Sequence, residues 1–161
     1  MECTKPKKRF LKRCGGEYNF FMHISAGAIV YRINQEKKEV VLLYRKKTDT
    51  YHLPKGTQET GEEILDTVLR EVREEAGVVV VVKNFLGQLD SQFERDGKII
   101  QKQTHYFLAE LVSQNLDQHD QEHDSVLWVD VSTAKKLLQE KGGVRLGMEN
   151  EMEVLEWFEA C

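Results

Sequence analysis

Proline and cysteine are scarce in this sequence: 161 residues contain two prolines, Pro6 and Pro54, and three cysteines. Cys3, Cys14 and Cys161 lie near the ends of the chain, and their odd number argues against a disulfide framework. A reducing, cytoplasmic location is therefore expected. The sequence also lacks an apolar run of the roughly 20 residues that a membrane helix requires, and its start lacks the order of segments found in a secretory signal.

The composition is that of an ordinary globular chain, with 40% hydrophobic and 31% charged residues. This length fits one domain, which we expect to span residues 21–161. Residues 1–20 form a basic N-terminal arm, because six lysines and arginines fall within residues 1–16. Such an arm is either a solvated tail or a contact for nucleic acid or an acidic membrane surface. The segment 148–161, in contrast, has five glutamates and no basic residue.

Apolar residues that recur every two positions predict strands, and apolar residues that recur every 3.6 positions predict helices. Short β-rich runs occur at 24–32, 40–44, 78–82, 86–93, 99–111 and 126–130. The polar break at 34–38 and the Asp96–Gly97 pair each predict a hairpin turn. Helical periodicity appears at 61–76, at 132–141 and in the last segment, where Val154, Trp157, Phe158 and Cys161 share a face. The sequence therefore predicts an α/β fold with a mixed sheet between layers of helices.

The predicted helix at 61–76 carries an unusual concentration of acidic residues. Thr60 and Glu63 have the spacing of a capping box at its start, and Gly77 stands where a left-handed cap would end it. Its predicted apolar stripe consists of Ile64, Leu65, Val68, Leu69, Val72 and Ala76. Seven acids lie between 59 and 75, against two arginines.

Glu71, Glu74 and Glu75 fall on one sector of this helix, where their charges repel one another. A solvated acidic face is the plainer interpretation. However, these glutamates occupy the last turns, where the helix dipole disfavours acids. The glycine-containing loop 55–61 also leads directly into the helix. Convergent carboxylates of this kind are typical ligands of Mg²⁺ or Mn²⁺, and a cation that also holds phosphate oxygens indicates pyrophosphate chemistry.

The loop and the helix together resemble the Nudix box, G-x5-E-x7-R-E-U-x-E-E-x-G-U. The matching residues are Gly56, Glu62, Arg70, Glu71, Val72, Glu74, Glu75, Gly77 and Val78. The motif constrains nine residues at fixed spacing, so a chance match is improbable, and the likeness extends from about Ile24 to Leu138. It implies a Nudix hydrolase, an α/β/α sandwich that splits a nucleoside diphosphate linked to another group with the help of Mg²⁺ or Mn²⁺.

The resemblance also implies roles for individual residues. Glu71, Glu74 and Glu75 would bind the metal together with the backbone carbonyl of Lys55, and Glu71 or Glu74 would act as or orient the base. Arg70 would tether the glutamates. Glu62 would brace the turn between loop and helix.

Features outside the box resemble the diadenosine-polyphosphate hydrolases within this family. These are Ser25–Tyr31, Leu53–Gly56 and Thr104–Ala109, together with the pair Glu122–His123 ahead of Trp128. Glu122 would then add a carboxylate to the metal cluster. This branch implies asymmetric hydrolysis of a dinucleoside tetraphosphate.

Phosphate and base contacts are predicted by residue type. Arg45, Lys55 and Lys102 are predicted phosphate clamps, beside Gly56, and Lys46 belongs to the same basic set. Phe93 stands where the branch usually has a tyrosine that stacks on a base, and Tyr51 and Tyr106 are further stacking candidates. Singly, each basic residue or aromatic also fits a surface or core role.

Other functions stay open at this point. Within the family, these are pyrophosphohydrolysis of oxidised purine nucleoside triphosphates, of inositol pyrophosphates or of capped RNA ends. A nucleotide-sensing Nudix module without activity would be expected to lack a metal carboxylate, whereas all are present here. A nucleic-acid-binding protein acting through the basic arm is disfavoured by the net charge of −4.

Overall fold

The computed structural model describes residues 22–146 and 148–160, so the predicted basic arm lies outside the described residues. The chain runs through seven strands, three α-helices and two short 3-10 helices within that part. The strands are β1 (Met22–Asn34), β2 (Lys37–Arg45), β3 (Thr50–His52), β4 (Lys55–Thr57), β5 (Val78–Arg95), β6 (Lys98–Gln114) and β7 (Ser125–Asp130). The α-helices are α1 (Ile64–Ala76), α2 (Val131–Lys141) and α3 (Met152–Glu159), and the 3-10 helices span Leu116–Gln118 and Gly143–Leu146.

A mixed sheet forms the centre of the fold, as predicted. Its strands follow the order β3-β2-β1-β6-β5, with β4 paired to β1 and β7 paired to β2. Strands β1 and β6 run parallel, and the other pairs are antiparallel. Both expected hairpins are present. Gln35 and Glu36 turn β1 into β2 with positive φ angles, and Asp96 and Gly97 do the same between β5 and β6.

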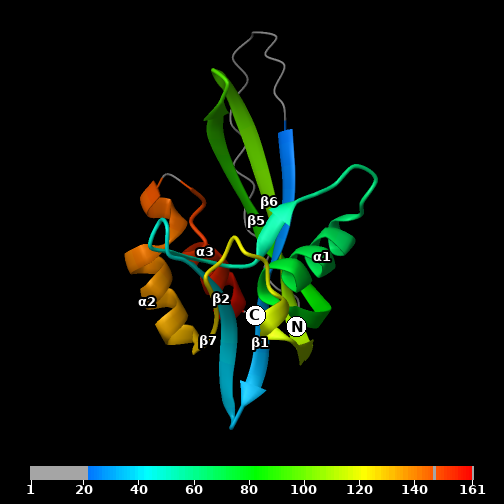
Figure 1. The fold of residues 1–161 in the computed structure, drawn as a ribbon, viewed down its shortest axis with the longest axis vertical. Coiled ribbons are helices and arrows are strands. Elements are labelled where there is room, and N and C mark those ends of the chain that lie inside the picture. Colours follow the sequence, from blue (N-terminus) through cyan, green and yellow to red (C-terminus); the bar gives the residue numbers. More distant parts are fainter. Residues whose placement is uncertain (1–21, 147, 161) are drawn as a thin grey trace.

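Alternating side chains of the sheet build one core on each face. Toward α1 point Ala26, Ala28, Val30, Val41 and Leu43, which pack with Val68, Val72 and Ala76. Toward α2 and α3 point Ile29, Val40, Leu42 and Tyr106, which pack with Ala134, Leu138, Val154, Leu155 and Phe158. Helix α1 thus lies on one side of the sheet and α2 and α3 on the other (Figure 1), which is the predicted three-layer arrangement.

Helix α1 begins three residues later than the sequence predicted. The predicted capping box is wrong: Glu63 is the N-cap and its side chain makes no capping bond in the described part of the chain. Gly61 adopts a positive φ of 82°, which takes Thr60 and Gly61 out of the helix. Leu65 and Leu69 are 48% and 42% exposed, so they also lie outside the predicted apolar stripe. The predicted end is confirmed, because Gly77 is left-handed and its N–H donates to the carbonyl of Arg73.

The remaining helices match the predicted pattern closely. Asp130 caps α2 by accepting from the N–H of Thr133, and Val154 and Phe158 of α3 are buried against the sheet. Cys161, predicted to share that face, lies outside the described residues. In the described part of the chain each helix is too short or too polar to cross a membrane.

Candidate active site

The glycine loop and α1 meet at a very close contact. Strand β4 is held against β1, where Lys55 pairs with Gly27 and Gly56 with Ala26. A Cβ atom added to Gly56 would lie 2.0 Å from the carboxyl carbon of Glu71. A side chain at position 56 would therefore have to displace this carboxylate, whereas glycine leaves it in place.

Arg70 joins the loop to the acidic helix. Its guanidinium donates to both carboxylate oxygens of Glu62, at 2.8 and 3.0 Å, and to the backbone carbonyl of Thr57 at 3.0 Å. It also donates to Glu71 at 2.7 Å and to Glu74 at 3.3 Å. The hydrogen bonds from Arg70 hold the pKa of Glu62 at about 2. A planar guanidinium with five donors suits such a junction, because it can fix several acceptors at once.

The three glutamates of the motif differ sharply in exposure. Glu75 is 9% exposed, and its carboxylate accepts the backbone N–H of Lys55 at 2.7 Å. Burial raises the pKa of Glu75 to about 8 against the opposing effect of this bond. Burial also raises the pKa of Glu71, against the opposing hydrogen bond of Arg70. Glu74, whose side chain is 52% exposed, points along the helix surface toward Arg70.

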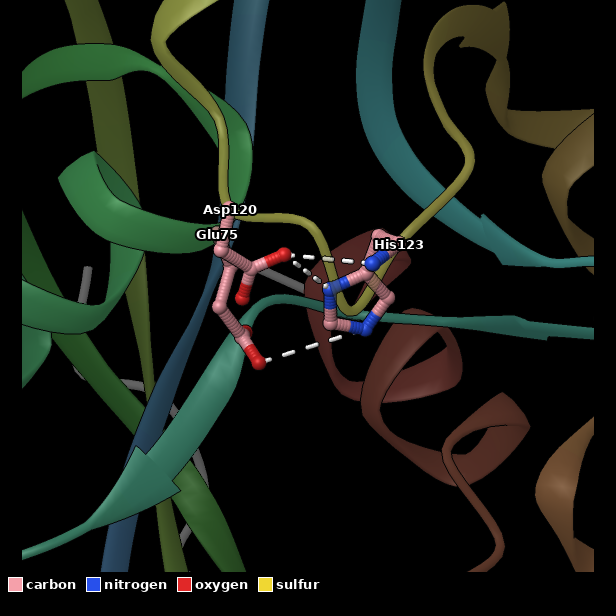
Figure 2. A group of neighbouring side chains, drawn as sticks. All are labelled: Glu75, Asp120 and His123. Carbon is pink, nitrogen blue, oxygen red and sulfur yellow. Dashed lines mark hydrogen bonds and ion pairs between the residues drawn. The ribbon is translucent and has the colours of Figure 1, made fainter.

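A loop after β6 closes over Glu75. Asp120 donates its backbone N–H to the carbonyl of Glu74 at 2.7 Å, and its carboxylate contacts Nδ1 of His123 at 3.1 Å. Nε2 of His123 lies 3.9 Å from the carboxylate of Glu75. Glu75, Asp120 and His123 therefore offer three potential metal-ligand atoms within 4.8 Å of one another (Figure 2). The neighbour Glu122 was predicted from the sequence, but Asp120 was not, because it carries no motif signal of its own.

Glu75, Glu122 and His123 line a cleft of about 390 Å³ between α1, β4 and the loop 119–124. Its wall consists of Ser25, Arg45, His52, Leu53, Lys55, Gly56, Thr57, Glu71, Glu75, Lys102, Glu122, His123 and Met148. A second cavity of about 240 Å³ shares His52, Lys55, Lys102 and Met148 with it. Ser91, Gln92, Phe93, Glu149 and Glu151 complete the lining of the second cavity. The cleft that contains Glu71 and Glu75 therefore adjoins the cavity that Phe93 lines.

The cleft contains buried polar groups that a ligand would satisfy. Oγ of Ser25 and Nε of Arg45 are buried without a hydrogen-bond partner among the residues that the structure describes. Unpaired buried polar atoms are costly, and they are usually explained by a ligand, an ion or water. Two half-buried or buried carboxylates with raised pKa are likewise stabilised by a cation. The residues present therefore fit a hard divalent ion bound by carboxylate oxygens.

Of the predicted stacking residues, only Phe93 lines a cavity in the described part of the chain. It is 38% exposed and meets His23 edge to face. Tyr51 packs on Tyr44 with ring centroids 4.9 Å apart and lines neither cavity. Tyr106 is completely buried, so the prediction that its ring stacks on a base is wrong. The residue was misassigned because β6 alternates inward and outward, and position 106 points inward.

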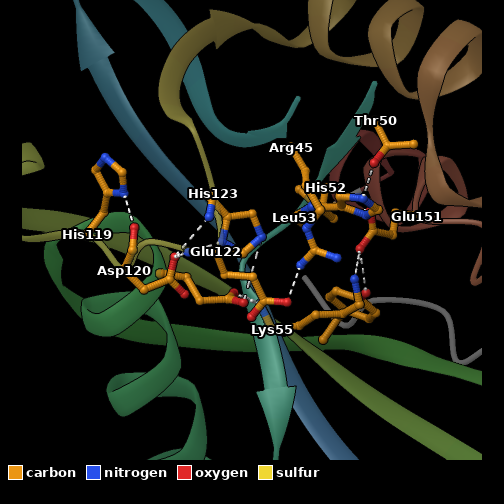
Figure 3. A network of polar contacts seen from close by, with 12 residues as sticks. Arg45, Thr50, His52, Leu53, Lys55, His119, Asp120, Glu122, His123 and Glu151 are labelled. Carbon is orange, nitrogen blue, oxygen red and sulfur yellow. Dashed lines mark hydrogen bonds and ion pairs between the residues drawn. The ribbon is translucent and has the colours of Figure 1, made fainter. Parts of the chain in front are cut away.

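Three of the four basic residues predicted as phosphate clamps are engaged in ion pairs. Arg45 donates to Glu122 at 2.5 Å and Lys55 donates to Glu151 (Figure 3), and Lys102 donates to Glu149 at 2.8 Å. For Lys46 the structure gives a hydrogen bond from its backbone N–H to the carboxylate of Asp124 at 2.6 Å. Glu149 and Glu151 were not predicted as site residues, because an acidic end of a chain is usually solvated. The two glutamates lie in the turn that leads into α3, where the N–H of Glu151 donates to the carbonyl of Glu149 at 3.2 Å.

Fold and cleft together define an α/β/α protein whose site combines a glycine loop with a helix of clustered glutamates. Residues 22–147 match the family model of the NUDIX domain. The chain belongs to the Nudix family.

Named relatives differ in how much of their length is matched. The MutT4 protein of Mycobacterium tuberculosis is 37% identical over 81 residues, which are 50% of this chain and 33% of that protein. The ADP-ribose pyrophosphatase of Methanocaldococcus jannaschii is 33% identical over 53% of this chain and 48% of its own. The chain thus spans half or less of these two relatives. The asymmetrical bis(5′-nucleosyl)-tetraphosphatase of the mouse is 28% identical over 73% of this chain and 85% of its own length.

Among solved structures, a binary complex of the Ap4A hydrolase of Caenorhabditis elegans superposes with a TM-score of 0.63. It is 25% identical in sequence, and the superposition covers 86% of this chain and 96% of that one. A NUDIX hydrolase from Nitrosomonas europaea superposes with a TM-score of 0.69 at 20% identity over 86% of this chain and 88% of that one. These matches support the three-layer fold that the sequence predicts.

Proposed function

We propose that this protein is a divalent-cation-dependent hydrolase that cleaves the pyrophosphate linkage of a nucleoside diphosphate derivative. The observation that carries the proposal is the placement of Glu71 and Glu75 in one cleft beside the Gly56 loop. Both carboxylates are held by hydrogen bonds, that of Glu71 by the side chain of Arg70 and that of Glu75 by the N–H of Lys55. Such preorganisation is what a catalytic group requires.

The charge of the cleft supports the need for a cation. The arginine and two lysines that line the two cavities are each paired with a carboxylate, and Glu71 and Glu75 add two more acids. A polyphosphate would meet repulsion here without a divalent ion. We assign the ion as Mg²⁺ or Mn²⁺, held by Glu71, Glu74 and Glu75 with the Lys55 carbonyl; Glu122 is a further predicted ligand. When bound, it neutralises phosphate charge and acidifies a water molecule.

The chain's own residues then position the reactants. Arg70 keeps the Glu71 carboxylate against the loop, where Glu71 serves as or orients the base for the attacking water. The unpartnered groups of Ser25 and Arg45 are available to phosphate oxygens. Phe93 offers a ring for a nucleobase in the adjoining cavity. These positions account for a substrate that has both a phosphate chain and a base.

As substrate we propose a dinucleoside tetraphosphate, split asymmetrically into a mononucleoside triphosphate and a monophosphate. Support comes from the similarity to the mouse tetraphosphatase, which covers 85% of that protein, and to the nematode Ap4A hydrolase. A diphosphate-linked nucleoside such as ADP-ribose is the second candidate, because the Methanocaldococcus relative acts on it by name. Oxidised purine nucleoside triphosphates, inositol pyrophosphates and capped RNA ends are further candidate substrates within the family.

The test is a panel of these compounds incubated with the protein and Mg²⁺, with the products resolved by chromatography. We expect a triphosphate and a monophosphate from the dinucleoside tetraphosphate, and no turnover after chelation. A preference of about a hundredfold or more for an oxidised triphosphate in kcat/KM would place the protein in another branch. Lack of metal-dependent turnover with the whole panel would overturn the hydrolase assignment.

A further inference from the structure

The segment Met148–Glu151 reaches into the cleft from outside the matched domain. The family match ends at residue 147, yet Met148, Glu149 and Glu151 all line the cavity that contains Phe93. This contribution therefore comes from residues that follow the matched range. The segment places two carboxylates beside the two lysines that the larger and smaller cavities share.

Glu149 is fixed by three donors from the sheet. Its carboxylate accepts from the hydroxyl of Thr104 at 2.7 Å, from the hydroxyl of Tyr106 at 3.1 Å and from Lys102 at 2.8 Å. Its side chain is 4% exposed. Tyr106 is fully buried, and its single hydroxyl proton faces Glu151 as well, at 3.3 Å, so the two glutamates share one anchor. A carboxylate held in this way cannot turn away when an anion approaches.

Lys102 lies at the boundary between the two cavities and is the more accessible of the two lysines. Its side chain is 23% exposed, whereas that of Lys55 is 11% exposed. A phosphate chain that runs from the Glu71–Glu75 end toward the Phe93 cavity would pass this ammonium group. Because Glu149 neutralises Lys102 there, the net charge that the phosphates meet is close to zero.

We infer that Glu149 is a specificity-determining residue, which lowers the affinity of the cleft for phosphate charge. This inference rests on the proposed function. A substrate is then discriminated by its nucleoside part more than by the number of its phosphates. A tetraphosphate bridge carries more charge than a diphosphate bridge, so Glu149 weakens the binding of a dinucleoside tetraphosphate more than that of ADP-ribose.

The variant Glu149→Gln removes the charge, keeps the size of the side chain and retains one oxygen that can accept from Thr104, while its amide group faces the hydroxyl oxygen of Tyr106, which can accept a hydrogen bond. Its matched control is Glu153→Gln, which removes the same charge from an exposed position in the same acidic stretch. We expect Glu149→Gln to lower KM for the dinucleoside tetraphosphate about three- to tenfold, with a smaller effect for ADP-ribose and an unchanged kcat. The difference should shrink at high salt, because the site is partly exposed. Glu153→Gln should leave both KM values unchanged.

If Glu149 had a purely structural role, Glu149→Gln would have a lower melting temperature than the wild type without a lower KM. An unchanged or raised KM in Glu149→Gln would overturn the inference. The double variant Lys102→Gln/Glu149→Gln guards against poor folding of the single one, since it removes the charge pair together. We expect it to lose the lower KM of Glu149→Gln, because the ammonium group that Glu149 neutralises is then absent. A KM in the double variant as low as in Glu149→Gln would mean that the effect does not act through Lys102, contrary to the inference.

Binding of inorganic tripolyphosphate, measured by calorimetry, separates this inference from the proposed function. If the wild type hydrolyses no nucleotide, the proposed function fails, whereas binding still reports on Glu149. Tighter binding of tripolyphosphate by Glu149→Gln than by the wild type supports the inference. Equal or weaker binding contradicts it.

Discussion

The carboxylate of Glu71 occupies the space in which a side chain at position 56 would stand. A Cβ on Gly56 would lie 2.0 Å from its carboxyl carbon and equally close to one of its oxygens. Contacts this short cannot be accommodated without a shift, and Glu71 is also held in place by a hydrogen bond from Arg70. The glycine of the loop and the glutamate of the helix therefore form one unit.

The variant Gly56→Ala is expected to displace Glu71 and to lower kcat by about 10²-fold, the scale of a misplacement near 1 Å. Steady-state hydrolysis gives the effect, and the control is Gly61→Ala. A Cβ at Gly61 meets no atom within 4 Å, so the cost there comes only from its positive φ of 82° and should appear in the melting temperature. Equal activity of the two alanine variants would show that the contact with Glu71 is unimportant.

Glu71→Gln and Glu74→Gln are expected to differ, because the structure buries one carboxylate and exposes the other. Glu71→Gln should lower kcat by about 10²–10⁴-fold, the range for loss of a positioned base, with a smaller loss in Glu74→Gln. In the absence of metal Glu71→Gln should also melt at a higher temperature, because burial disfavours the charged form of Glu71. Rates are measured against Mg²⁺ concentration, alongside thermal melts with a chelator.

Glu63→Gln serves as the control for these glutamate variants. Glu63 is exposed and its side chain makes no capping bond in the described part of the chain, so both rate and stability should stay near the wild type. Wild-type rates in both Glu71→Gln and Glu74→Gln would mean that this helix face is merely solvated.

Arg70→Lys should lower both activity and stability, although it keeps the positive charge. A single ammonium cannot reach Glu62, Glu71 and the carbonyl of Thr57 in the same geometry. We expect kcat to fall about 10–100-fold, as for other groups that orient metal ligands. The control is Arg73→Lys, because Arg73 is exposed and lies about one helical turn after Arg70 in α1. Hydrolysis rates and melting temperatures are measured for both variants. Equal values for the two variants would show that the fork geometry of Arg70 has no role.

Much of the fold followed from local patterns in the sequence. The alternation of Val40, Val41, Leu42 and Leu43 between the two cores, the Asp96–Gly97 turn and the Gly77 cap are each set by neighbouring residues. The start of α1 was missed because Gly61 takes a positive φ, which overrides the capping pattern at Thr60. The capping pattern alone does not determine the backbone conformation of the loop that contains it.

The site was only partly predictable for a different reason. The relation of Gly56 to Glu71 belongs to a motif with fixed spacing, whereas Lys55 with Glu151 and Lys102 with Glu149 are separated by 96 and 47 positions. Such pairs depend on how the C-terminal segment crosses the sheet. The same limit applied to Tyr106, whose inward position becomes visible only from its contacts with both glutamates.

The pairing of Lys55 with Glu151 predicts a specific dependence of stability on pH. Burial alone would favour the neutral acid, but the charge of Lys55 and the hydrogen bond from His52 outweigh it and hold the pKa of Glu151 at about 2, below its ordinary value of 4.5. A group whose pKa is lowered by folding stabilises the protein above the ordinary value, and this stabilisation is lost as the pH falls from about 4.5 toward about 2.

Glu151→Gln removes this contribution and leaves Lys55 buried without its partner. We expect a melting temperature lower than that of the wild type by on the order of 10 °C at pH 7. The difference should narrow steadily below pH 4.5, because the wild type then loses the same charge. Melts are recorded from pH 3 to pH 7 with a chelator, and Glu153→Gln, which is exposed, should show a small difference that does not change with pH. A constant gap between Glu151→Gln and the wild type over the whole range would mean that packing, rather than the ion pair with Lys55, accounts for the stability that Glu151 provides.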